Sequence, residues 1–124
     1  MRRAWRLRAG TDFARVREHG RVWRHPLLVL TASPAQNVMS PIRAGITVSR
    51  RVGTAVVRNR AKRRLREVFR LQYPRLIGGW DLVFVVRPAA AEASYQELAA
   101  SALSLLRRAG LIDEAMTETG QVTV

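Results

Sequence analysis

The chain has 124 residues, no cysteine and a net charge of +13 from 22 basic and nine acidic side chains. That length suits one domain with a single modest core, and a hydrophobic fraction of 48% favours a folded chain over a disordered one. The lack of cysteine excludes disulfides, thiolate metal sites and cysteine nucleophiles. The charge predicts a polyanionic partner.

Arginine supplies nearly all of the positive charge, because Lys62 is the only lysine. A planar guanidinium binds phosphate through paired hydrogen bonds and stacks on bases, which favours nucleic acid, although a GC-rich genome would also enrich arginine. The basic N-terminal stretch lacks the apolar core of a secretory signal, and no apolar run is long enough for a membrane span. We expect a cytoplasmic protein with no membrane partner.

The first half of the chain predicts one helix and two strands. Residues 11–20 form a short amphipathic helix that Thr11 can cap and Gly20 can end. Two apolar runs, 22–33 and 42–51, are separated by a loop rich in Pro, Asn and Ser. We expect them to be neighbouring antiparallel strands.

The second half predicts a helix, a strand and a helix. Thr54 can cap a long helix that continues without Gly or Pro as far as Tyr73. Residues 81–88 are apolar at almost every position, as in a central strand buried on both faces. Ser94 and Glu97 have the spacing of a capping box at the start of the last helix.

These elements predict an α+β fold in the order αββαβα, a small sheet with helices packed on it. If strands 42–51 and 81–88 are parallel, the long helix is their crossover. Residues 1–124 form a single domain, and we expect the basic arm, 1–8, and the tail, 112–124, to be flexible.

The long helix separates its apolar and basic residues onto opposite sides. The apolar arc consists of Val57, Ala61, Leu65, Val68 and Phe69, and the basic side consists of Asn59, Lys62, Arg63, Arg66 and Arg70. Like charges four residues apart repel one another, and a merely solvated face would usually intersperse glutamates. This face therefore predicts contact with a polyanion.

Acidic residues are absent between Glu18 and Glu67, an interval with eleven arginines or lysines. Metal-assisted phosphodiester hydrolysis needs clustered carboxylates, and metal-free hydrolysis needs a positioned base. Asp12 and Asp81 more plausibly border a helix and a strand, and both histidines lie beside turns. We expect neither catalytic nor metal-ligating residues in the protein, so any catalyst lies elsewhere.

The stretch "GITVSRRVGTAVVRNRAKRRLREVFR" (45–70) closely resembles the signature of the protein subunit of bacterial ribonuclease P. The matching residues are Ser49, Arg50, Arg51, Gly53, Arg58, Asn59, Arg60, Lys62, Arg63 and Arg66. The segments "LRAGTDFARVREHG" and "DLVFVVRPAAAEASYQEL" resemble the opening helix and the last strand and helix of the same family, so the resemblance covers nearly the whole chain.

The resemblance implies a single-domain α-β sandwich, with a four-stranded sheet and about three helices in the order αβββαβα. It also implies a left-handed β-α-β crossover, against the general rule for such connections. The implied function is that of the RNA-binding subunit of an endonuclease that removes 5′ leaders from precursor tRNAs. The catalytic RNA and its Mg²⁺ ions would perform the hydrolysis, in a complex with one protein and one RNA.

The resemblance also implies the binding residues. RNA contacts are expected from Arg58, Asn59, Arg60, Lys62, Arg63, Arg66 and Arg70 on the helix, and from Ser49, Arg50 and Arg51 at the strand end. A groove for the precursor's leader is expected from Phe13, Arg17, Val29 and Val48. Relatives commonly have an aromatic residue in place of Arg17 and often a tyrosine near Leu30, so phosphate contact by Arg17 is expected to replace stacking.

Two other classes share the basic face: a structural RNA-binding protein of ribosomal type, and a DNA-binding module that places its helix in the major groove. Neither requires the Ser-Arg-Arg-x-Gly sequence that precedes the helix (49–53). The second class also requires a helix-turn-helix spacing that is not present.

Overall fold

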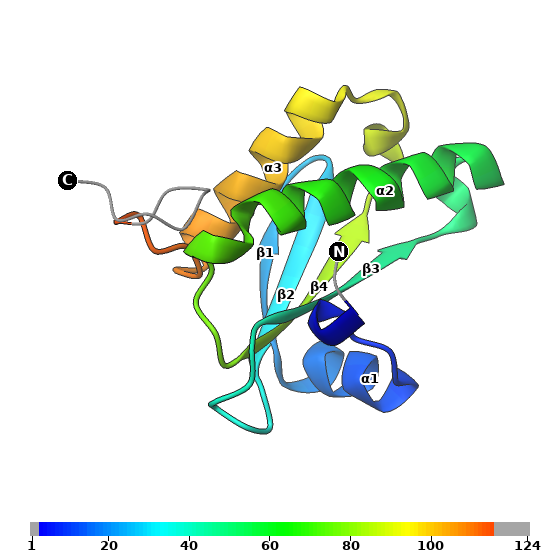
Figure 1. Cartoon of the computed structure of the whole chain (residues 1–124). Coiled ribbons are helices and arrows are strands. Elements are labelled where there is room, and N and C mark those ends of the chain that lie inside the picture. The colour runs from blue at the N-terminus through cyan, green and yellow to red at the C-terminus, as the bar shows by residue number, and fades with distance from the viewer. Residues whose placement is uncertain (1–2, 116–124) are drawn as a thin grey trace.

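The computed structural model of the chain describes residues 3–115. The elements are α1 (Gly10–His19), β1 (Arg21–Arg24), β2 (Leu28–Pro34), β3 (Arg43–Val48), α2 (Ala55–Gln72), β4 (Trp80–Val86) and α3 (Tyr95–Arg108), joined by short 3₁₀ turns. The order is αβββαβα, so the predicted α+β fold is confirmed (Figure 1). Within the described part of the chain, no helix combines the length and apolarity needed to cross a bilayer.

The sheet has the strand order β1-β2-β4-β3. Strand β4 is parallel to β3 and antiparallel to β2, which confirms that the apolar run is central and that α2 is the crossover between parallel strands. The prediction that the two earlier apolar runs are neighbours is wrong, because β4 inserts between β2 and β3. A strand that is apolar on both sides stabilises the sheet most at an inner position.

The apolar run 22–33 is a hairpin rather than one strand. β1 and β2 pair antiparallel around a turn in which Pro26 has no backbone N–H to donate. The His25 backbone N–H donates to the Leu28 carbonyl at 2.9 Å, and the Leu27 N–H donates to the His25 Nδ1 at 3.1 Å. Leu27 and Leu28 continue the apolar pattern through the turn, so the sequence pattern does not reveal that a turn is present.

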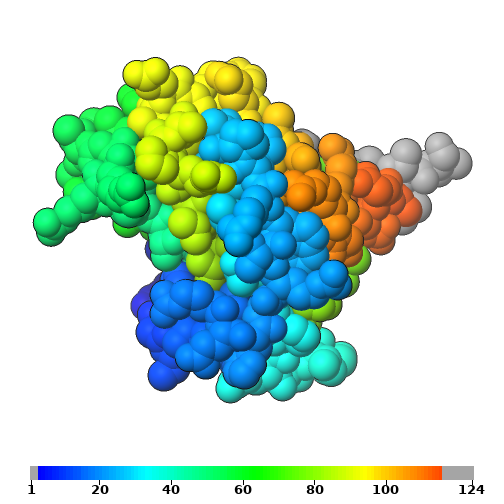
Figure 2. Space-filling view, turned by 180° about the vertical axis from the view of Figure 1, so that it is seen from behind, coloured from blue at the N-terminus to red at the C-terminus, as the bar shows by residue number. Residues whose placement is uncertain are grey.

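The two faces of the sheet pack against different helices. Leu30, Leu82 and Phe84 belong to the main core with α2 and α3, whereas Val83 packs with Val16 of α1 on the other face. In Figure 1, α2 and α3 lie together over one side of the sheet, and α1 lies near its lower end. Because only one short helix covers the second face, part of that face remains accessible (Figure 2).

The predicted caps are present on α2 and α3 but not at the start of α1. Thr54 caps α2, and Ser94 and Glu97 form the predicted capping box on α3. Helix α1 begins at Gly10, after an N-cap at Ala9 that lacks a side-chain bond, so Thr11 does not cap it. Gly20 ends α1 in an extended conformation, and glycine is required there because a Cβ would lie 2.4 Å from the Val16 carbonyl oxygen.

Residues 3–8 and 112–115, which belong to the ends expected to be flexible, make contacts with the rest of the fold. The Trp5 ring stacks on Tyr73 with centroids 3.5 Å apart, and Leu7 is buried. At the other end, Ile112 is buried and Glu114 forms an ion pair with Arg75 at 3.0 Å. The remainder of the expected arm and tail lies outside the described residues.

Helix α1 is held to the sheet by ion pairs as well as by apolar contacts. Asp81, fully buried in β4, accepts hydrogen bonds from Arg15 of α1 and from Arg43 of β3. Asp12 lies 3.6 Å from Arg15 and 3.7 Å from Arg43. The hydrogen bonds to Asp81 raise the pKa of Arg43. The two carboxylates balance two of the chain's arginines, so Arg15 and Arg43 hold the fold together rather than adding to its free positive charge.

Candidate nucleic-acid interface

Helix α2 is held to the sheet by the apolar arc that its periodicity predicted. Ala61, Leu65, Val68 and Phe69 are buried in the main core, and Val57 packs against its edge. The backbone on this side is therefore fixed, so the basic side chains of the other face project from a rigid support.

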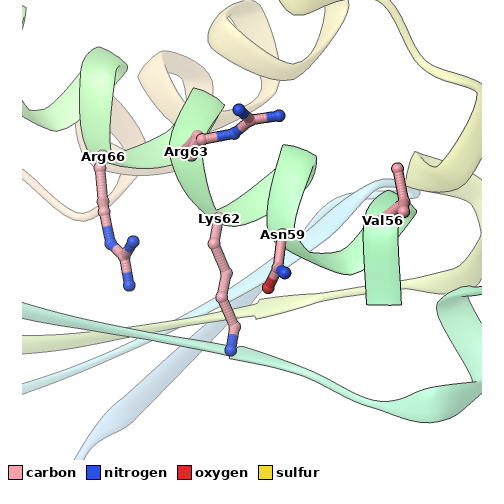
Figure 3. A pocket seen from close by; sticks show the side chains of 5 residues that line it. All are labelled: Val56, Asn59, Lys62, Arg63 and Arg66. Carbon is pink, nitrogen blue, oxygen red and sulfur yellow. The ribbon is translucent and has the colours of Figure 1, made fainter. Parts of the chain in front are cut away.

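Four of the predicted RNA contacts line one open hollow on the outer side of α2. These are Asn59, Lys62, Arg63 and Arg66, with the exposed Val56 at one end. Figure 3 shows Asn59, Lys62 and Arg66 projecting from one side of the helix, and Arg63 turned away from them. No carboxylate lines this hollow, so its positive potential is not neutralised locally.

Arg60 and Arg64 point towards the segment before α3 instead. Arg60 donates to the Ala91 carbonyl at 3.5 Å, and Arg64 donates to the Ala93 carbonyl at 3.0 Å. With Arg63, Glu67 and Tyr95 they line a second hollow between α2 and α3. Because a backbone carbonyl is neutral, Arg60 and Arg64 keep their positive charge. Each side chain is nevertheless already hydrogen-bonded to the protein.

Arg70 differs from the other predicted contacts because it is paired. Its guanidinium donates to both carboxylate oxygens of Glu67, at 3.0 and 2.6 Å. These hydrogen bonds lower the pKa of Glu67 and raise the pKa of Arg70, although both groups are solvent-exposed. Arg70 therefore offers a phosphate less net charge than Lys62, Arg63 or Arg66.

The residues between β3 and α2 extend the basic surface around the start of the helix. Ser49, Arg50 and Arg51 are exposed, and Val52 anchors the turn in the core. Gly53 has a φ of 154°, which favours glycine, and a Cβ there would lie 3.2 Å from the Val57 side chain. Arg58 is partly buried, and its Nε lacks a hydrogen-bond partner within residues 3–115.

A narrow groove lies between α1 and the sheet. It is lined by Phe13, Arg17, Thr31, Thr47, Val83 and Val85. Figure 2 shows α1 in dark blue beside the sheet, with an indented outline between it and the green residues near the start of α2. Of the four predicted groove residues, Phe13 and Arg17 line it, and Val29 lies on the same face, paired with Val85.

Val48 does not belong to this groove. Along β3, Ala44 and Ile46 pack with the main core under α2, and Val48 follows the same alternation. Thr47 takes the groove position instead. Strand parity could have revealed this from the sequence, because an apolar Ala44 and Ile46 pointing inward place Thr47 on the opposite face.

Leu30 is fully buried on the α2 and α3 side, and its neighbour Thr31 faces the groove. The groove therefore has Phe13 as its one aromatic lining residue, with the exposed Arg17 beside it. This arrangement fits a single-stranded polyanion, because an unpaired base can stack on the ring while the guanidinium binds a phosphate.

Arg6 is a residue of this region that the sequence reasoning missed. Together with Phe13, Ala44, Gly45, Ile46 and Arg66 it lines a hollow beside the outer edge of β3. No pattern in the sequence places the N-terminal arm there, because the contact depends on the Trp5 ring reaching Tyr73.

The two histidines lie beside side chains of Glu18 and Ser101. His19 is exposed, 3.9 Å from Glu18, and the His25 Nδ1 lies 2.8 Å from the buried Ser101 hydroxyl on α3. Among residues 3–115, no three His, Cys, Asp or Glu side chains are grouped closely enough to hold a metal ion.

Comparison with known proteins identifies a single family. The family model for ribonuclease P matches residues 1–110. The ribonuclease P protein component of Roseiflexus castenholzii is 47% identical over 120 residues, covering 96% of this chain and 97% of its own. That of Clostridium novyi is 39% identical, covering 90% and 98%.

Two solved structures have the same fold. The ribonuclease P protein of Staphylococcus aureus matches with a TM-score of 0.82 at 25% identity, covering 89% of this chain and 99% of that one. The protein from Thermotoga maritima matches with a TM-score of 0.75 at 28% identity, covering 83% and 96%.

Proposed function

The chain belongs to the ribonuclease P protein family, and we propose that it binds the catalytic RNA of that enzyme through α2 while its α1 groove holds the leader of precursor tRNA. Membership of the family makes it an RNA-binding subunit of the endoribonuclease that matures the 5′ ends of tRNAs.

One observation carries the assignment of α2 to the catalytic RNA: Lys62, Arg63 and Arg66 share an open surface without a carboxylate. A folded RNA presents closely spaced phosphates, and each contact releases counterions. The proposed contacts are Arg58, Asn59, Arg60, Lys62, Arg63 and Arg66, with Ser49, Arg50 and Arg51 at the start of the helix. Arg70 is expected to contribute less because Glu67 binds it.

The groove is the proposed site of the leader because it is narrow, partly apolar and edged by Arg17. A single strand can insert an unpaired base against Phe13, whereas the bases of a duplex are already stacked. Phe13, Arg17, Thr31 and Thr47 would contact the leader, and Val29 would border it.

The hydrolysis belongs to the RNA subunit, whose phosphates would hold the Mg²⁺ ions. The protein would lower the Mg²⁺ requirement, because its guanidinium groups neutralise phosphates that otherwise repel one another as RNA and substrate associate. One protein bound to one RNA in the cytoplasm is the assembly we propose.

Reconstitution tests the function directly. The purified chain, mixed with a bacterial ribonuclease P RNA, should cleave precursor tRNA at low Mg²⁺ far faster than the RNA alone. Equal rates with and without the chain would contradict the proposal, and cleavage by the protein alone would contradict its non-catalytic role. A chain with Lys62, Arg63 and Arg66 replaced by alanine is the matched control and should give little stimulation.

A further inference from the structure

We call the hollow at the outer edge of β3 the arm hollow. It adjoins the groove between α1 and the sheet. It is lined by Arg6 of the N-terminal arm, Arg66 of α2, Phe13 of α1 and residues 44–46 at the edge of β3. Phe13 also lines the groove, so the two depressions meet at its ring. A single strand that lies in the groove can continue into the arm hollow and reach the basic side of α2.

The arm hollow has a positive charge that would attract an anion. No carboxylate lines it, and the nearby Asp12 is within 3.7 Å of both Arg15 and Arg43. The Nε of Arg6 is buried and has no hydrogen-bond partner in the described part of the chain. Buried donors in proteins are nearly always paired, so this N–H is available to an acceptor supplied by a ligand.

Two contacts on either side of Arg6 join the arm to the rest of the fold. The Trp5 ring stacks on Tyr73 at 3.5 Å and meets Phe69 edge-on at 6.5 Å. The Leu7 backbone N–H donates to the Ala44 carbonyl at 3.1 Å, which joins the arm to the edge of β3. These two contacts place the backbone of Arg6 beside the hollow before a ligand binds, which lowers the entropic cost of binding.

We propose that the arm hollow binds one nucleotide of the precursor's single-stranded leader, with its phosphate between Arg6 and Arg66 and its base on Phe13. Two guanidinium groups suit a phosphate, and an aromatic ring suits an unpaired base. The shared Phe13 favours the leader over the catalytic RNA as the occupant. The inference rests on the proposed function, since it presumes that the groove holds the leader.

The test measures the affinity of the reconstituted enzyme for precursor tRNAs whose leaders lengthen by one nucleotide at a time. With the wild-type chain, affinity should rise at the length that reaches the arm hollow. Arg6→Ala should abolish that increment, about tenfold, and leave the affinity for shorter leaders and for the catalytic RNA unchanged. Arg8→Ala is the matched control, because Arg8 is exposed on the same arm and outside the hollow.

A second measurement begins with the wild-type enzyme alone and adds a conservative variant afterwards. Leaders with a neutral methylphosphonate at a single position should bind the wild-type enzyme more weakly at one position close to the groove. Arg6→Lys should reduce that position's effect, because lysine retains the charge and loses the paired hydrogen bonds.

The outcomes are distinguishable. Equal loss for all leaders would place Arg6 on the catalytic RNA and overturn the inference, as would an Arg6→Ala enzyme that matches the wild type at every leader length. Failure of the wild-type chain to stimulate cleavage would instead overturn the proposed function.

Discussion

The ring of Phe13 lies directly on the backbone of Gly45, so that a Cβ at Gly45 would come within 2.4 Å of two ring atoms. This contact sets how closely α1 approaches β3. It also sets the position of the one ring shared by the groove and the arm hollow. The glycine is needed for close approach, because any larger side chain would push α1 away from the sheet.

Gly45→Ala should displace Phe13 and destabilise the fold by roughly 1–3 kcal/mol, the usual cost of an added methyl group in a tightly packed site. Thermal or urea unfolding measures the loss, and leader affinity should fall with it. Gly10→Ala is the matched control, because a Cβ at Gly10 has no neighbour within 4 Å. Equal stability of the two variants would contradict the contact.

Arg66→Ala should weaken binding of the catalytic RNA and flatten its salt dependence by about one phosphate, a change of roughly 0.7–0.9 in the slope of log K against log salt. Titrations at several salt concentrations measure the slope. Arg24→Ala serves as the control, because Arg24 is exposed on β1, at the opposite edge of the sheet. An unchanged slope for Arg66→Ala would assign Arg66 to the solvated surface.

Asp81→Asn should destabilise the protein by roughly 2–3 kcal/mol, because Arg15 and Arg43 lose their shared buried carboxylate. Both arginine side chains are partly exposed, which limits the loss. Asp12→Asn should cost less, since its oxygens lie 3.6 Å or more from the same arginines. Chemical denaturation compares the two variants, and a larger effect at Asp12 would refute the proposed importance of Asp81.

Glu97 should make α3 less stable in acid. Hydrogen bonds from the backbone and side chain of Ser94 lower the pKa of Glu97 in the folded protein. A lowered folded pKa means that this stabilisation is complete above the unfolded-state pKa and is lost as the pH falls through the folded value. Unfolding between neutral and acidic pH should show a weaker pH dependence for Glu97→Gln than for the wild type. Glu92→Gln, at an exposed site before the helix, is the control.

Much of the fold was accessible from the sequence. The apolar arc of α2, the cap at Thr54, the capping box at Ser94 and the central position of β4 were all predicted from local patterns. The hairpin at residues 21–34 was missed, because Leu27 and Leu28 keep the pattern apolar through a turn. The groove was predicted with Val48 in place of Thr47, because a resemblance transfers positions without testing which side of a strand each one faces.

The sequence by itself determined the family, the sign of the partner's charge and the two sides of α2. The signature at residues 45–70 reveals the family, the composition gives the sign of the charge, and helical periodicity separates the two sides of α2. Only the tertiary structure decided which cations are free and where the arm lies. Arg15 and Arg43 meet Asp81 across distant segments, and Trp5 meets Tyr73 nearly seventy residues along the chain. Such contacts depend on strand order and close packing, which local patterns do not specify.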